Sequence, residues 1–110
     1  MSDIAEFNEH LLNHVNNGEY GQDIVDKVHK MVNRSNKALN TAYTVGYGSG
    51  AAQAHQEATL EAENAAKLVY KNGASPDGGP ASFEVGNAAV LGSLQQSHKD
   101  FVDSLPENNR

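Results

Sequence analysis

Residues 49–70 read SGAAQAHQEATLEAENAAKLVY, an alanine-rich stretch in which no glycine or proline follows Gly50. Alanine loses no side-chain entropy on entering a helix, so this run strongly favours an α-helix. Its apolar residues are mostly small and recur three or four positions apart, which places them on one face. This stripe consists of Ala51, Ala54, Ala58, Ala62, Ala65, Leu68 and Val69. Because small side chains let another helix approach closely, we expect the stripe to be a surface for self-association.

The rest of the chain divides into further helices separated by turn residues. Apolar residues at helical spacing, together with turn residues such as Asn-Gly, Gly-Pro and Pro between them, predict helices at about 3–16, 23–45, 50–71 and 82–105. A loop is expected at 72–81, where glycine and proline are frequent. We therefore predict a single all-α domain over residues 1–110, an antiparallel bundle or hairpin of three to four helices that forms oligomers.

A glycine-rich segment, Val45-Gly46-Tyr47-Gly48-Ser49-Gly50, separates the second helix from the alanine-rich one. Each glycine costs about 1 kcal/mol of helix stability relative to alanine, so we expect a hinge or kink at Gly46, Gly48 and Gly50. A continuous helix through these residues is the alternative, because glycine also permits close helix packing. The string TVGYG in this segment also occurs in potassium-channel filters, but the residues that follow are too polar to span lipid.

A basic stripe lies on the second helix, opposite its apolar face. It consists of Lys27, Lys30, Arg34 and Lys37, spaced three and four apart. Such a face can bind an acidic partner, or it can simply be solvated and balance the acidic residues that precede it. We keep it as a possible partner-binding face.

The bulk composition limits the function classes. With 14 acidic and 8 basic residues the net charge is -6, which argues against binding to nucleic acid or to an anionic membrane surface. Hydrophobic residues make up 38% of the chain and aromatic residues 6%, so a lone monomer would have a thin core, for which oligomerisation is a common remedy. The chain has no cysteine, no run of apolar residues long enough to span a membrane and no signal-peptide pattern at its start, so we expect a cytoplasmic protein.

No constellation of side chains predicts catalysis. His10 and His14 stand one helical turn apart with Glu6 on the same face, but a full metal-ligand set is not visible. The five histidines change charge between about pH 5 and 8, so together they can make a packed assembly respond to acid. We predict no enzyme activity, no catalytic or metal-binding residues and no cofactor.

Residues 22–70 resemble the R-body or "killing trait" proteins of bacteria. The resemblance rests on Ile24-Val25-Asp26-Lys27-Val28, on Ala38-Leu39 and Tyr43, and on Ser49-Gly50 followed by a helix that ends in Leu68-Val69-Tyr70. The family's glutamine-rich segment is represented here by Gln53 and Gln56 alone. The resemblance implies a small protein that assembles into coiled ribbons, which in some hosts extend on acidification.

The patterns together favour a non-enzymatic structural protein that packs against copies of itself through its alanine- and glycine-rich helix faces. The alternative is a small helical binding module, a regulator or inhibitor of phage or defence origin, that docks on another protein. The expected partners are therefore the chain itself or another protein, without nucleic acid and without a membrane span.

Overall fold

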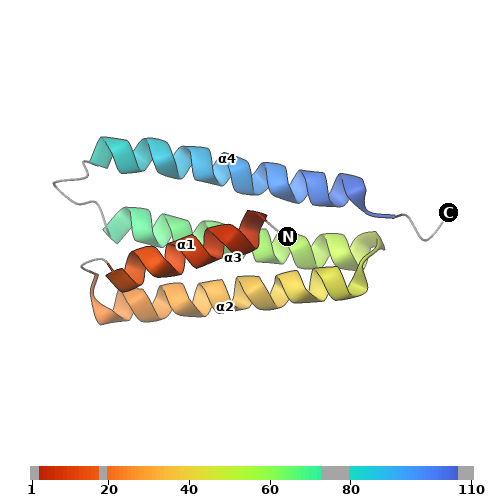
Figure 1. Ribbon diagram of the computed structural model, residues 1–110, viewed down its shortest axis with the longest axis horizontal. Coiled ribbons are helices and arrows are strands. Elements are labelled where there is room, and N and C mark those ends of the chain that lie inside the picture. The colour runs from red at the N-terminus through yellow and green to blue at the C-terminus, as the bar shows by residue number, and fades with distance from the viewer. Residues whose placement is uncertain (1–2, 18–19, 73–79, 107–110) are drawn as a thin grey trace.

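The computed structural model describes residues 3–17, 20–72 and 80–106, which form four α-helices (Figure 1). These are α1 (Asp3–Asn17), α2 (Gln22–Val45), α3 (Gly48–Asn72) and α4 (Pro80–Ser104). The prediction of an all-α helical bundle is thus confirmed for the described residues, and each helix begins and ends within two residues of an expected one. Most of the expected loop at 72–81 lies outside the described residues.

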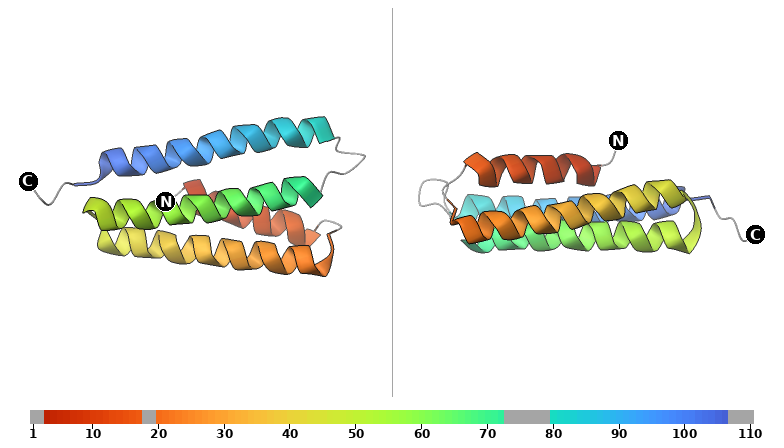
Figure 2. Two further views of the ribbon diagram at one scale, coloured as in Figure 1. Left: turned by 180° about the vertical axis from the view of Figure 1, so that it is seen from behind. Right: turned by 90° about the horizontal axis from the view of Figure 1, so that it is seen from below.

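The three long helices lie side by side as a layer with α3 in the middle (Figures 1 and 2). The helix α1 packs on one side of this layer and contacts all three of its members. Within the described residues the backbones of α2 and α4 make no contact with each other, because α3 separates them. The layer is therefore held together through α3, which carries the alanine-rich sequence.

The helix α1 is too short to cover the whole layer. At about 1.5 Å per residue, its 15 residues span about 22 Å, whereas the 24 residues of α2 span about 36 Å. Figure 1 shows that α1 covers the end near the α1–α2 link and that its N-terminus lies near the middle of the layer. The other half of the same face, toward the α2–α3 turn, has no fourth helix over it.

The core consists of two clusters along the length of α3. One contains Ile4, Ala38, Leu39, Ala58, Ala62 and Leu94, and the other contains Leu11, Val15, Val28, Val32, Ala65 and Val69. On α3 a series of buried positions alternates four and three apart, the spacing of a coiled-coil seam, namely Ala51, His55, Ala58, Ala62, Ala65 and Val69. Thr59, Glu63 and Ala66 are buried beside this series, so α3 is covered over more than one narrow stripe.

A buried polar contact links α1, α2 and α3 near the middle of the molecule. The hydroxyl of Ser35 donates to the carbonyl oxygen of Ala58 at 2.8 Å and accepts from the amide Nδ2 of Asn8 at 2.9 Å. The same amide group donates to Asn36 Oδ1 at 3.0 Å, while Asn8 Oδ1 is buried without a hydrogen-bond partner. A buried acceptor without a partner, such as Asn8 Oδ1, costs about 1–3 kcal/mol, which offsets much of the stability that the three hydrogen bonds contribute. The contact therefore serves mainly to favour one register between the helices.

The chain reverses direction between α2 and α3 in a tight turn built by glycine. Gly46 caps α2 in the left-handed conformation with φ 74°, and its N–H donates to the carbonyl oxygen of Ala42 at 2.9 Å. Gly48, with φ 68°, begins α3 two residues later. Residues with a Cβ are strained at such angles, whereas glycine is not. In place of a kink within one bent helix, the structure has two separate antiparallel helices.

Candidate functional site

The most distinctive group of side chains is a cluster of rings from α2, α3 and α4, which we call the histidine cluster. It consists of Tyr43, His55, His98 and Phe101. His55 enters it because it occupies a core position on α3, one turn before Ala58, and its side chain is 1% exposed. Ile4, near the start of α1, packs with Leu39, Ala58 and Leu94, and the residues of the cluster lie three or more positions from these along their helices, toward the α2–α3 turn. Aromatic rings thus join α2, α3 and α4 on that side.

The rings are packed at close range around His55. Its imidazole stacks on Phe101 with 4.1 Å between ring centroids and an interplanar angle of 10°, and on His98 at 5.2 Å and 21°. Tyr43 meets both His55 and Phe101 edge-on, the latter at 5.3 Å. Contacts of this kind contribute about 0.5–1.5 kcal/mol each beyond the area they bury. The cluster therefore joins α4 to α2 through side chains although the two backbones do not meet.

A hydrogen bond between two imidazoles fixes the protonation of the pair. Nδ1 of His55 and Nδ1 of His98 are 2.9 Å apart, so one nitrogen carries the proton and the other accepts it. The accepting ring must be neutral. Burial, and to a smaller extent the charge of the neighbouring His98, lower the pKa of His55 to about 4. At neutral pH His55 is thus uncharged.

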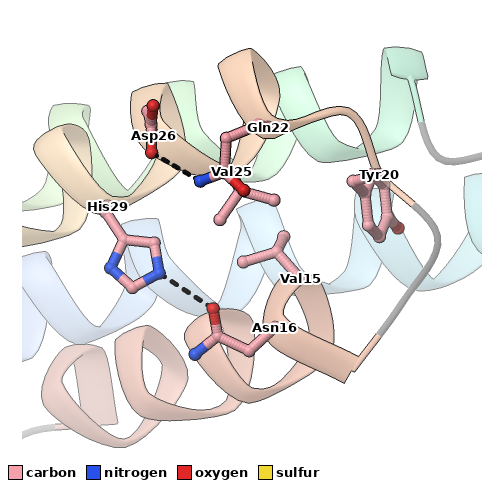
Figure 3. Close-up of a pocket in the computed structure, with 7 residues that line it drawn as sticks. All are labelled: Val15, Asn16, Tyr20, Gln22, Val25, Asp26 and His29. Atoms are coloured by element: carbon pink, nitrogen blue, oxygen red, sulfur yellow. Dashed lines mark hydrogen bonds between the residues drawn. The ribbon is translucent and has the colours of Figure 1, made fainter.

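A second site, the hairpin pocket, lies between the end of α1 and the start of α2 (Figure 3). It has a volume of about 550 Å³ and is lined by Val15, Asn16, Tyr20, Gln22, Val25, Asp26 and His29. Figure 3 shows the two valines in the middle, with polar pairs on either side of Val25. The polar residues of the pocket are all exposed or half-buried, so the pocket is open to solvent. All of them except Tyr20 lie on helices.

The polar groups of the hairpin pocket already bond to one another. His29 Nε2 and Asn16 Oδ1 are 2.9 Å apart, and Gln22 Nε2 donates to Asp26 Oδ1 at 2.8 Å. The hydroxyl of Tyr20, whose pKa is raised by burial, lies 2.6 Å from Nε2 of His14. The Asn16–His29 pair connects α1 to α2, and the His14–Tyr20 pair connects α1 to the residue that precedes α2, whereas Gln22 and Asp26 both lie on α2. The arrangement is that of a structural link rather than of groups held ready for a substrate.

The stripe on α3 that was expected to contact other copies lies largely inside the monomer. Five of its members are buried, namely Ala51, Ala58, Ala62, Ala65 and Val69, and Ala54 and Leu68 are half-buried. The neighbours of Ala58 and Ala62 in the core come from α1, α2 and α4 of the same chain. Close helix contact was thus the correct physical expectation, but the helices in contact belong to one chain. Contact with another copy through this stripe would require these helices to separate.

The basic stripe lies on the solvent side of α2. Lys27, Lys30, Arg34 and Lys37 are all exposed, and within the described residues none of them forms an ion pair or a side-chain hydrogen bond. They are four of the 8 basic residues of a chain whose net charge is -6. The stripe is therefore a local positive surface on an otherwise acidic molecule.

The histidines of α1 do not converge on a common point. His10 is exposed, and His14 is bound to Tyr20. Across the described residues, no three histidine, aspartate or glutamate side chains are grouped so that they could hold a metal ion. In the same part of the chain no helix is both long and apolar enough to cross a membrane.

The sequence reasoning missed the histidine cluster. The burial of His55 could have been predicted, because position 55 belongs to the four-and-three spacing that runs from Ala51 to Val69. Its partners His98 and Phe101 lie on α4, more than 40 residues away. Nothing in the local pattern of α4 indicates which of its residues would meet His55.

Comparisons of the chain with known protein families, with curated proteins and with solved structures find no match. The resemblance to R-body proteins stays a prediction.

Proposed function

We propose that the protein is a non-enzymatic structural protein that self-associates through helix surfaces. The observation that carries this proposal is the incomplete cover of the helical layer: α1 spans about 22 Å of a face that the long helices extend to about 36 Å. Helical layers are stable when their apolar faces are covered by another layer. A second copy can supply the cover that the chain itself lacks.

The thin core supports the same proposal. Among the residues whose burial the structure describes, seven of the fifteen buried hydrophobic ones are alanines, which bury far less area than leucine or isoleucine. Domains of this size with small cores gain stability when they oligomerise. Association would add buried apolar area without any change in the fold of the monomer.

The test is the molar mass of the purified chain in solution. Sedimentation velocity over about a hundredfold range of concentration should give a mass that rises above 11.8 kDa as concentration rises. Negative-stain electron microscopy then distinguishes closed oligomers from ribbons. A mass of one chain at every concentration would contradict the proposal.

A second candidate function, docking on an acidic protein, is favoured by the exposed basic stripe on α2. Four cations at helical spacing without ion-pair partners in the described residues can face an acidic helix of a partner protein. A synthetic glutamate-rich helical peptide is a suitable probe, with binding followed by amide chemical shifts. Binding confined to α2, weakened by salt and lost in a Lys30→Glu, Arg34→Glu double variant would support docking, with Lys67→Glu on α3 as the control.

A further inference from the structure

Large apolar side chains are exposed at one end of the bundle. Among the described residues, Tyr43 is 52% exposed, Tyr47 47%, Val102 37% and Leu60 50%. Tyr43 lies near the end of α2, Tyr47 between α2 and α3, and Val102 near the end of α4. These segments meet in space, since the N–H of Gly48 lies 3.4 Å from the carbonyl oxygen of Pro106 (Figure 1). We call Tyr43, Tyr47 and Val102 the tyrosine end. It adjoins the half of the layer that α1 leaves uncovered.

The tyrosine end coincides with the longest uncharged part of the chain. Residues 38–56 contain no aspartate, glutamate, lysine or arginine, although charged residues make up 20% of the sequence. Away from this end, acidic residues occur on the exposed surfaces of α1, α2 and α3, so two copies with a charge of -6 each repel when those surfaces approach. At 38–56 two copies can approach without burying like charges. Nearby on α4, Lys99, Asp100 and Asp103 are exposed and provide a charged rim.

The residues of this end suit a protein contact. Tyrosine, serine, glycine, asparagine and threonine dominate the exposed positions from Asn40 to Ser49, and tyrosine supplies a large contact area at low entropic cost. The ring of Tyr43 is already held edge-on against His55 and Phe101. An anchor that is ordered before binding loses little further freedom on association.

We propose that two copies of this chain bind each other through the tyrosine end and the uncovered half of the layer beside it. This inference rests on the proposed self-association and assigns its surface. Because the same patch is used by both copies, the contact is two-fold symmetric and closes as a dimer.

The chain offers a matched pair of variants to test this surface. Tyr47→Lys places a cation in the tyrosine end, where the two-fold axis brings it near the same lysine of the second copy. Within the described residues Tyr47 has no ring contact or hydrogen bond, so the substitution removes no contact of this kind inside the monomer. Leu60→Lys places the same charge at an equally exposed apolar residue in the middle of α3, outside this end. We expect Tyr47→Lys to weaken dimerisation at least about tenfold in sedimentation velocity and Leu60→Lys to leave it unchanged. Circular dichroism verifies that both variants remain folded, and Val102→Lys repeats the test if one of them does not.

The outcomes separate the two proposals. If the wild-type chain is a monomer at all concentrations, self-association itself is wrong. If it associates and Tyr47→Lys associates equally well, self-association stands and the tyrosine end is not its surface.

Single cysteines give an independent measurement, because the natural chain has none. Spin labels on Tyr47→Cys should give a short distance between copies, and labels on Leu60→Cys a longer one or none. The reverse order of distances would overturn the assignment of the surface.

Discussion

The buried imidazole of His55 should make the fold sensitive to acid. An unfolded histidine takes up a proton near pH 6.5, whereas burial and the neighbouring His98 lower the pKa of His55 to about 4 in the folded chain. Between these two pH values the unfolded chain binds more protons, so the free energy of unfolding is highest above pH 6.5 and falls as the pH drops toward 4. At about 1.4 kcal/mol per pKa unit, the difference between 6.5 and about 4 corresponds to at most about 3 kcal/mol.

The assay is urea unfolding followed by circular dichroism at a series of pH values from neutral to about pH 4. His55→Phe keeps a flat ring that can stack on Phe101 and removes the titrating group. We expect the wild-type chain to lose up to about 3 kcal/mol more over this range than His55→Phe does. His10→Gln, which removes an exposed histidine of α1, should follow the wild-type curve. Equal pH dependence of the wild type and His55→Phe would refute the assignment of acid sensitivity to His55.

Three further predictions concern stability and can be measured by thermal or urea unfolding. Gly46→Ala should destabilise the chain by about 1 kcal/mol because position 46 has φ 74°, whereas Gly92→Ala, in mid-helix with open space around it, should stabilise it by up to about 1 kcal/mol. Equal effects of the two substitutions would contradict the described turn. Ser35→Ala should cost about 1–2 kcal/mol because it removes the hydroxyl between Asn8 and α3, and an unchanged midpoint would mean that this contact is not formed. Ala58→Leu should cost about 1–3 kcal/mol by overpacking the core of the monomer, and full retention of stability would place Ala58 outside it.

The fold follows from local patterns because each helix carries its own signals. The four-and-three spacing on α3 defines its buried face, and the glycines after Val45 end one helix and begin the next. The helix α4 begins at Pro80, two residues before the expected start at 82, because proline lacks an N–H and fits the first helical position. These features depend on residues that are close in sequence, so the sequence alone suffices to predict them.

The identity of the packing partners does not follow from such patterns. The alanines at 58 and 62 indicate close contact with another helix, but spacing is the same whether that helix belongs to the same chain or to a second copy. The pairing of His55 with His98 depends on the register between α3 and α4, which no local pattern sets. The exposed tyrosine end likewise depends on the short reach of α1, which becomes visible when the helices are placed side by side.

The central position of α3 also has a consequence for the order in which the molecule opens. In the described residues the backbone of α4 approaches those of α3 and α1 but not that of α2, which α4 meets through the ring contact between Phe101 and Tyr43. We therefore expect that α4 can leave the bundle while the tight α2–α3 hairpin stays intact. Amide protons of α4 should then exchange with solvent through an opening of lower free energy than those of α2 and α3. Such an opening breaks the imidazole pair and brings His55 into water. We therefore expect the α2–α3 hairpin to stay folded in states in which α4 has detached from it.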